Sequence, residues 1–466
     1  MCEWRSKFKP DYQCKAPTEP GSKYCIFHEP GEKDIEKFKE KLYEQIDQPG
    51  LHGANNHQFD FRGYVFPVAV VACGGSRERQ GLVLPKEIPE RLNCQEVVAR
   101  ERMDFSFITT KGLISFRHAV FEDSVNFTSA EIGGRADFCH ARFMGSAFFS
   151  YATFQGHISF DETFFNWGVS FYQALVNAHA AFWKCTSGAA VSLDRILIRD
   201  DLSFREARIK GVLGLRRALI EGNVYFEEGT IGKLRLSGAT IEGKADFSGM
   251  VVTGTADFTT SIFRRVAVFS NVRFLGKTLL AGTHASGIDL GPGRPTTIWS
   301  PSGRQGLHLL HHSTRPFFWH FARRAFESEG KPREADAAYY FERVSRLTPQ
   351  RVSLYPRSWH LRNVPRVFLR ILILVFQWLP DCLFLRWPTA YGASLARLFA
   401  TWAVLIGAFT SAYYVLCRLG VLLFDASSPG LEFPFSFGRA LYFSVITFTT
   451  LGYGDIRPAP PVSEVL

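Results

Sequence analysis

The chain has 466 residues, a formal net charge of +10 and an apolar fraction of 46%, with 44 phenylalanines against 15 tyrosines. Its length fits about two to four domains, and its apolar content is sufficient to bury a sizeable core. Nine cysteines, an odd number spread over the whole chain, accompany a polar N-terminus that lacks the apolar stretch of a signal peptide. These features exclude a secreted disulfide scaffold and predict free thiols in a reducing cytosol.

The first segment, residues 1–34, contains four residues of the types that bind zinc. Cys2, Cys14, Cys25 and His28 follow the spacing C-x11-C-x10-C-x2-H, and the last pair has the two-residue gap of a zinc knuckle. Three thiolates and one imidazole would fill all four positions around a tetrahedral Zn²⁺ ion. We therefore expect a structural zinc site without an open position for catalysis. The alternative is that four unrelated polar residues share a frayed terminus.

Residues 35–100 are predicted to be a mixed linker and lead-in. Residues 101–290 repeat a three-residue unit, in which a small residue is followed by any residue and then by a large apolar residue. The large residues lie alternately six and five positions apart, and the register slips by one near 232–236. Before the slip they include Phe121, Phe127, Ile132, Phe138, Phe143, Phe149, Phe154, Phe160, Phe165, Phe171, Val176 and Phe182. Two apolar residues separated by one position point the same way along an extended chain, so each unit predicts a short strand followed by a corner.

This pattern resembles the pentapeptide-repeat family, in which a small residue stands two positions before a central Leu or Phe. The resemblance implies a right-handed β-solenoid, although the alternation of five and six departs from the strict fives of the family. A coil with four faces would take about 22 residues, which gives about eight coils.

The charges of the predicted solenoid nearly balance, with 21 Lys and Arg against 19 Asp and Glu over residues 100–290. We therefore expect no nucleic-acid partner. No nucleophile is paired with a base along the repeats, so we do not expect an enzyme. The solenoid is interpreted as a rigid spacer or as a docking surface for a cytosolic protein partner.

Residues 305–350 are predicted to form a helical hairpin, because two helical patterns flank a break at 330–332. The segment 304–397 holds fifteen Lys and Arg against six Asp and Glu, a net charge of +9. A basic segment beside an apolar one indicates a position next to a membrane. Residues 364–390 are expected to form an interfacial helix, because their apolar stretch 367–385 contains Arg370, Asp381 and Pro380; a true membrane span is the alternative.

The clearest transmembrane helix is predicted within residues 394–424. Leu398–Cys417 is a run of twenty residues without a charged side chain, which is long enough to span a bilayer. Arginines crowd the N-terminal side of this run, and only Arg418 lies close beyond it. By the positive-inside rule, the N-terminal body is cytosolic and the protein lies in the cell or plasma membrane.

Residues 436–456 resemble the pore helix and selectivity filter of potassium channels. The filter residues by this resemblance are Thr449, Thr450, Leu451, Gly452, Tyr453, Gly454 and Asp455. The resemblance implies that the backbone carbonyls of residues 450–453, with the Thr450 hydroxyl, bind the permeant K⁺. It also implies that Tyr453 packs against the pore helix and that Asp455 forms hydrogen bonds behind the filter. Gly452 and Gly454 permit the positive φ that a row of carbonyls pointing one way requires.

One filter strand cannot enclose an ion, so this chemistry predicts a homotetramer that conducts K⁺ passively. The family pattern also requires a second, pore-lining helix, whereas the chain ends eleven residues after Asp455, which makes 457–466 a truncated end. Two interpretations stay open. The sequence is either an incomplete potassium-channel subunit or a non-conducting, membrane-anchored β-solenoid scaffold. The fold class is therefore multidomain: a β-solenoid with a small zinc-binding segment, a helical hairpin and an α-helical membrane domain.

Overall fold

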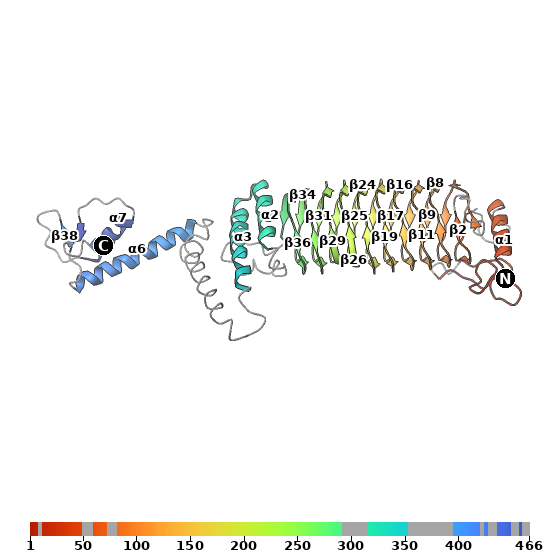
Figure 1. The fold of residues 1–466 in the computed structure, drawn as a ribbon, viewed down its shortest axis with the longest axis horizontal. Helices are drawn as coiled ribbons and strands as arrows, with labels where there is room; N and C mark the ends of the chain where they lie inside the picture. The colour runs from red at the N-terminus through yellow and green to blue at the C-terminus, as the bar shows by residue number, and fades with distance from the viewer. Residues whose placement is uncertain are drawn as a thin grey trace, which may run out of the picture. The chain divides into compact units, whose positions relative to one another are not determined.

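The computed structural model describes residues 1–7, 12–48, 59–71, 82–290, 315–352, 395–419, 424–426, 436–448 and 456–458. The chain divides into two compact units, Met1–Arg346 and Leu347–Leu466, which are described separately. The first unit contains a long β-solenoid, as predicted, with a helix at each end (Figure 1). The interfacial helix expected over 364–390 lies outside the described residues.

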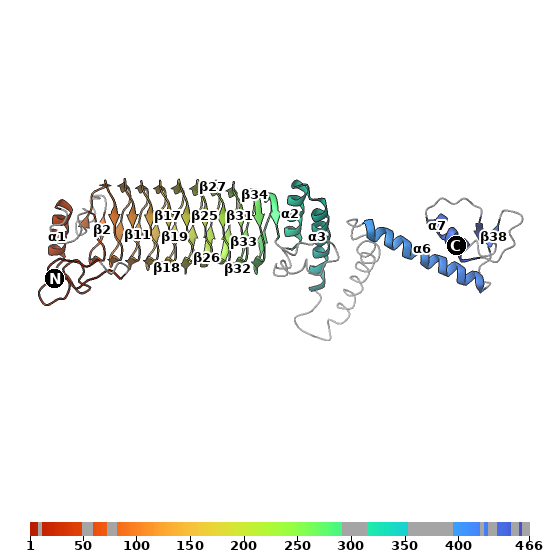
Figure 2. The same cartoon turned by 180° about the vertical axis from the view of Figure 1, so that it is seen from behind.

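The solenoid consists of two long parallel sheets that lie back to back along its length (Figures 1 and 2). The first sheet contains β1 (Val65–Phe66), β2 (Val70–Val71), β3 (Leu82–Val83), β6 (Val98–Ala99), β7 (Met103–Asp104), β10 (Val120–Phe121), β11 (Val125–Asn126), β14 (Arg142–Phe143), β15 (Ala147–Phe148), β18 (Phe164–Phe165), β19 (Val169–Ser170), β22 (Thr186–Ser187), β23 (Val191–Ser192), β26 (Arg208–Gly214), β29 (Thr230–Arg235), β32 (Val251–Val252), β33 (Ala256–Asp257), β35 (Arg273–Phe274) and β36 (Thr278–Leu279). The second sheet contains β4 (Glu87–Ile88), β5 (Leu92–Asn93), β8 (Thr109–Thr110), β9 (Ile114–Ser115), β12 (Glu131–Ile132), β13 (Ala136–Asp137), β16 (Thr153–Phe154), β17 (Ile158–Ser159), β20 (Leu175–Val176), β21 (Ala180–Ala181), β24 (Leu197–Ile198), β25 (Leu202–Ser203), β27 (Leu219–Ile220), β28 (Val224–Tyr225), β30 (Thr240–Ile241), β31 (Ala245–Asp246), β34 (Ile262–Val268) and β37 (His284–Asp289).

The strand register gives the length of one coil. Val120 on β10 pairs with Arg142 on β14, which lies 22 residues further along the chain. The predicted slip near 232–236 is confirmed, because Val212 on β26 pairs with Lys233 on β29, only 21 residues away. A second slip of one residue, which was not predicted, occurs where β34 pairs with β37, between Phe263 and Val266. The stacked strands already begin at Val65, so the segment predicted as a lead-in over 35–100 contains strands of the solenoid.

Two kinds of corner explain why the steps alternate between five and six residues. In the five-residue step from Phe116 to Phe121, His118 has a φ of 58° and the Ala119 N–H donates to the Phe116 carbonyl at 3.0 Å. The six-residue step from Phe121 to Phe127 turns without a residue of positive φ. The positive φ values recur every eleven residues, at Glu96, Phe107, His118, Ser129, His140, Tyr151, Glu162, Gln173, Lys184, Arg195, Glu206, Arg217 and Glu228.

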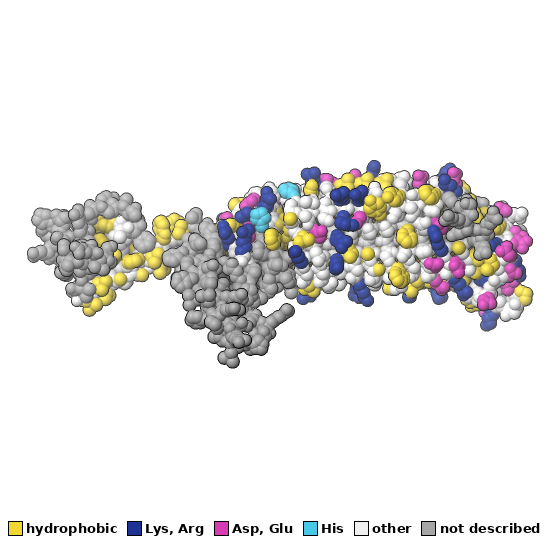
Figure 3. All heavy atoms as spheres, viewed as in Figure 1, with side chains coloured by type: hydrophobic (Ala, Val, Ile, Leu, Met, Phe, Trp, Pro, Cys, Tyr) yellow, Lys and Arg dark blue, Asp and Glu magenta, His cyan; other side chains and the backbone are white. Residues whose placement is uncertain are grey.

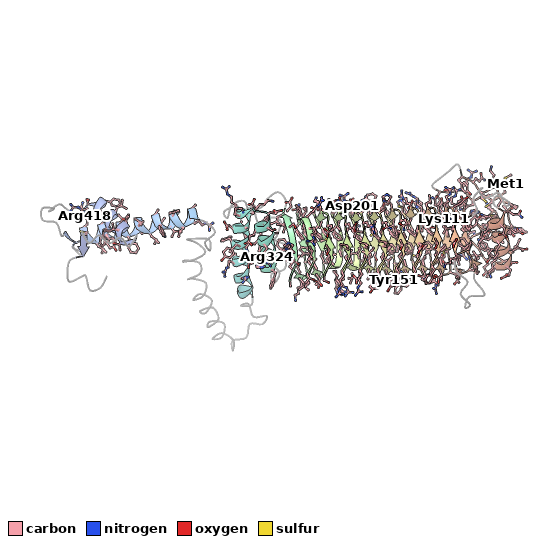
Figure 4. All side chains as sticks on the ribbon, turned by 90° about the horizontal axis from the view of Figure 1, so that it is seen from above. Met1, Lys111, Tyr151, Asp201, Arg324 and Arg418 are labelled. Atoms are coloured by element: carbon pink, nitrogen blue, oxygen red, sulfur yellow. The ribbon has the colours of Figure 1, made fainter. Side chains whose placement is uncertain are left out.

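Phenylalanine fills the solenoid core as columns of stacked rings. The rings of Phe116 and Phe138 lie 5.4 Å apart at an angle of 4°, and those of Phe138 and Phe160 lie 4.8 Å apart at 7°. The small residue of each unit, such as Ala119, is also fully buried and leaves room for these rings. Polar side chains radiate outward instead, as Tyr151 and Asp201 illustrate at opposite edges (Figure 4). The core is therefore continuous from one coil to the next.

Helices cover both ends of the solenoid. At the N-terminal end, α1 (Ile35–Asp47) buries Phe38, whose ring contacts Phe66 at 5.8 Å. At the C-terminal end, α2 (Arg315–Ser328) packs on β37, and Phe318 contacts Phe269 at 5.7 Å. The predicted hairpin continues into α3 (Pro332–Val352) after Gly330, which has a φ of 68°. End caps of this kind prevent the exposed coils of a solenoid from associating with other chains.

The second unit contains four described elements. They are α6 (Leu395–Arg418), β38 (Phe424–Ala426), α7 (Phe437–Phe448) and β39 (Ile456–Pro458). Helix α7 packs against α6, and β38 pairs with β39 in an antiparallel arrangement.

Candidate metal centre and pore segment

The structure brings together the four residues predicted to bind zinc. The ligand atoms of Cys2, Cys14, Cys25 and His28 all lie within 4.8 Å of one another, and all four side chains are buried. The sulfurs of Cys14 and Cys25 are 3.9 Å apart, and the Cys2 sulfur is 3.8 Å from Nδ1 of His28. A tetrahedral ion with metal–sulfur bonds of about 2.3 Å would hold its sulfurs about 3.8 Å apart. The cluster therefore has the size and the ligand types of a closed metal site.

The other ring nitrogen of His28 fixes the orientation of the imidazole. Nε2 lies 3.1 Å from the backbone carbonyl of Arg62, so Nε2–H donates there and Nδ1 is left free to bind a metal. The Trp4 ring stacks on His28 at 4.3 Å, and a Cβ on Gly63 would lie only 2.0 Å from Cζ2 of Trp4. Gly63, with a φ of 70°, is therefore required for this close packing.

Hydrogen bonds within the cluster favour the thiolate at Cys2, and those to Cys2 and Cys25 raise the pKa of the Cys14 thiol well above its usual range. Side-chain hydrogen bonds from Cys14 and Cys25 lower the pKa of the Cys2 thiol well below its usual range. The backbone N–H of Cys25 donates to the Cys2 sulfur at 3.3 Å and adds to this effect. Because the thiolate is the form that binds metal, the arrangement is suited to a divalent cation.

Lys33 links the solenoid to the group of Cys2, Cys14, Cys25 and His28, which we call the metal cluster. Its Nζ donates to the carbonyl of Phe27, between two cluster residues, at 3.0 Å and to the carbonyl of Val65 on β1 at 2.8 Å. Burial lowers the pKa of Lys33 to about 7. The sequence offered no signal for the contacts of Lys33, Arg62 and Trp4, because they depend on residues distant in the chain.

The candidate membrane segment is α6, of which Ala396–Arg418 is long and apolar enough to cross a bilayer. Several of its large side chains are exposed: Phe399 is 63% exposed and Val404 is 70% exposed. The atoms of α6 that are visible in Figure 3 are mostly hydrophobic. A helix with apolar side chains on its outside is typical of contact with lipid.

Helix α7 packs on α6 through aromatic and small residues. Tyr413 contacts Phe443 at 5.2 Å, Tyr414 contacts Phe437 at 5.9 Å, and Ala440 is fully buried. The twelve residues of α7 extend about 18 Å, which is shorter than the hydrocarbon core of a bilayer of about 30 Å. Helix α7 therefore has the length of a helix that enters a membrane without crossing it.

Strands β38 and β39 define where this segment begins and ends. β38 follows α6 and β39 follows α7, and Ala426 pairs with Ile456 between them. The chain between these strands therefore leaves and returns at one place, as a re-entrant loop must. The predicted filter residues Thr449, Thr450, Leu451, Gly452, Tyr453, Gly454 and Asp455 fall between α7 and β39 and lie outside the described residues.

Comparison with known families agrees with both parts of the architecture. Residues 396–465 match the ion channel family, and residues 111–151 match the pentapeptide repeats with nine copies. Comparison with curated proteins and with solved structures gave no match. The chain thus combines a pentapeptide-repeat solenoid with an ion channel segment, as the sequence predicted, and neither family is a family of enzymes. The ion channel match and the apolar helix α6 together indicate a membrane protein.

Proposed function

We propose that this chain is a subunit of a potassium-selective channel with a cytosolic β-solenoid domain. The observation that carries the proposal is the position of Thr449–Asp455 in the chain. These seven residues follow the half-length helix α7 and precede β39, which pairs with β38 at the start of the same loop. A loop that enters a membrane and returns to the same side is where a channel places the backbone that contacts its ion.

The proposed ligands for K⁺ are the backbone carbonyls of residues 450–453 and the hydroxyl of Thr450. Carbonyl oxygens replace the water molecules around a dehydrated K⁺ when four such strands surround one axis. The functional unit is therefore a homotetramer. The C-terminal end of α7 leads directly into this segment, and its partial negative charge favours a cation there.

The proposed metal at Cys2, Cys14, Cys25 and His28 is Zn²⁺ in a structural role. Three thiolates and one imidazole are typical of zinc, and four protein ligands leave no position for a reacting water. Cys94, Cys139 and Cys185 are free thiols, which is consistent with a reducing cytosol for the solenoid. In this arrangement the solenoid serves as a spacer or a docking surface on the cytosolic side of the channel.

The test is potassium flux from proteoliposomes that contain the protein expressed from its complete gene. We expect wild-type protein to conduct K⁺ in preference to Na⁺ and Gly452→Ala to abolish the flux, because an added Cβ opposes the positive φ at that position. Gly407→Ala is the matched control, since a Cβ at Gly407 on α6 meets no atom within 4 Å. Wild-type flux in Gly452→Ala would overturn the filter assignment. A correctly inserted wild-type tetramer that conducts no K⁺ would favour the non-conducting scaffold instead.

A further inference from the structure

A cavity of about 280 Å³ lies on the surface of the first coils of the solenoid. Residues of β5, β9 and β13, and of the segments beside these strands, line it. Its polar lining consists mainly of donors: Arg62, Arg91, Arg135, Asn93, Gln95 and Ser115. We call this cavity the arginine pocket.

Among the residues that the structure describes, two of the three arginines in the pocket have no counter-charge. Arg62 forms an ion pair with Asp60 at 2.7 Å and lies over the ring of Tyr12 at 3.8 Å. Within the described part of the chain, neither Arg91 nor Arg135 forms an ion pair or a hydrogen bond through its side chain. The Nε atom of Arg91 is moreover fully shielded from solvent and has no hydrogen-bond partner there.

The carboxylate in the pocket does not neutralise these two arginines. Asp137 forms an ion pair with Arg117 at 3.3 Å and accepts a hydrogen bond from the backbone N–H of Cys139 at 3.0 Å. Its charge is therefore directed toward groups other than Arg91 and Arg135. The pocket keeps an excess of positive charge among neutral amide and hydroxyl groups.

The planar guanidinium group binds phosphate and carboxylate oxygens through two parallel hydrogen bonds. A bound oxyanion would accept such hydrogen bonds from the guanidinium groups that line the pocket and neutralise the excess charge. The volume is near the lower limit of ordinary ligand pockets, which suits a small soluble ion or ester and not a chain segment.

From this geometry we infer that the arginine pocket is a binding site for a small soluble oxyanion of the phosphate type, held by Arg91 and Arg135. The site adjoins the metal cluster, because the backbone carbonyl of Arg62 accepts the hydrogen bond from His28 while the Arg62 side chain lines the pocket. The inference concerns the solenoid unit and does not depend on conduction through the pore.

The test is isothermal titration of the full-length, detergent-solubilised protein with inorganic phosphate at constant ionic strength. We expect saturable binding that weakens about tenfold or more in Arg91→Ala and in Arg135→Ala, because each change removes a charged donor. Asp137→Asn should bind phosphate more tightly, since it removes a negative charge but keeps the acceptor for the Cys139 N–H. Arg273→Ala is the matched control, because Arg273 is an exposed arginine on β35 outside the pocket.

Thermal unfolding of each variant shows whether a loss of phosphate binding is caused by a loss of folded protein. Arg135 is exposed, so Arg135→Ala keeps the test valid if Arg91→Ala does not fold. Titration with acetate at the same ionic strength distinguishes a site for phosphate from one for any carboxylate. No saturable binding by folded wild-type protein would overturn the inference, as would equal binding by wild type, Arg135→Ala and Asp137→Asn.

Discussion

Single glycines allow the coils of the solenoid to stack at the six-residue corners. A Cβ at Gly134 would lie 2.6 Å from the carbonyl carbon of Gly112 in the preceding coil, and a Cβ at Gly156 would lie 2.7 Å from that of Gly134. These contacts involve backbone, which cannot rotate away as a side chain can. At Gly134 and Gly156 a side chain therefore requires the neighbouring coils to move apart.

We expect Gly134→Ala to destabilise the solenoid by about 1–3 kcal/mol, as is usual when a methyl group is forced into a packed site. Gly168→Ala is the matched control, because a Cβ at Gly168 would meet its nearest atom at 3.5 Å, an ordinary contact. Urea unfolding of both variants measures the difference. Equal stability of Gly134→Ala and the control would show that the coils separate at no cost.

The metal cluster leads to a prediction about the zinc content of the purified protein. Wild-type protein should retain one zinc ion per chain, and Cys25→Ser should retain almost none, because a hydroxyl is a poor zinc ligand compared with a thiolate. Zinc should also be lost as the pH falls from 7.5 to 5, since protons compete with the metal for the thiolates and the imidazole. Elemental analysis after gel filtration measures both effects.

The control for this prediction is Cys139→Ser. Cys139 is another buried thiol, but its sulfur lies 3.0 Å from the hydroxyl of Ser159 and outside the cluster. This variant should keep its zinc. A full zinc content in Cys25→Ser, or an equal loss in both variants, would contradict a zinc site at the cluster.

At the scale of secondary-structure elements, the end helices stabilise the solenoid because its last coil has no neighbour on one side. Phe318 on α2 is 1% exposed and lies against Phe269, whereas Phe317, the preceding residue, is 64% exposed. The two phenylalanines therefore differ in burial on the same helix. Substituting each of them therefore measures how much the packing of α2 on the last coil stabilises the solenoid.

We expect Phe318→Ala to destabilise the capped end by about 3–5 kcal/mol, as is usual for a buried Phe. Phe317→Ala should change the stability by about 0.5 kcal/mol or less, as is usual for an exposed side chain. Because each coil contacts only its neighbours, hydrogen exchange should increase first at β34 and β37. Uniform exchange along the whole solenoid in Phe318→Ala would contradict this local role.

The sequence predicted the solenoid itself because its pattern is local: a small residue, a large residue and a corner recur within each eleven-residue unit. The slip near 232–236 was visible for the same reason, since it displaces every later large residue. The second slip, between β34 and β37, falls where Ala285 takes the place of the large residue Phe263 and interrupts the pattern. The coils before residue 101 were not predicted because their spacing is irregular: Phe66 on β1 pairs with Ala99 on β6, which lies 33 residues further along the chain instead of 22.

The metal cluster and the arginine pocket differ in how far the sequence alone predicts them. The four residues proposed to bind a metal were predicted from residue type and spacing, but the Arg62 carbonyl that orients His28 was not, because any residue can supply a carbonyl. The arginine pocket had no local signal either. Arg91 and Arg135 are 44 residues apart in the sequence and meet only because coils of 22 residues place them two coils apart on one face.

At the scale of the whole molecule, charge and apolar surface determine how the chain is placed in a membrane. The basic residues of 304–397 precede α6, and the large apolar side chains of α6 are exposed. Positive charge next to a membrane helix is retained on the cytosolic side. The solenoid should then lie in the cytosol, and the segment after α6 should begin on the outer side.

Cysteine labelling of intact cells with a membrane-impermeant maleimide tests this arrangement. We expect Ser436→Cys, at the start of α7, to be labelled in intact cells, because α7 begins on the outer side if α6 crosses the membrane once. Arg273→Cys, on the exposed surface of β35, should be labelled only after lysis, because the membrane separates it from the reagent. Mass analysis of each site distinguishes the introduced cysteine from native thiols such as Cys417.

Labelling of Arg273→Cys in intact cells would place the solenoid outside the cell and contradict the topology. Labelling of both sites only after lysis would show that α6 does not span the membrane.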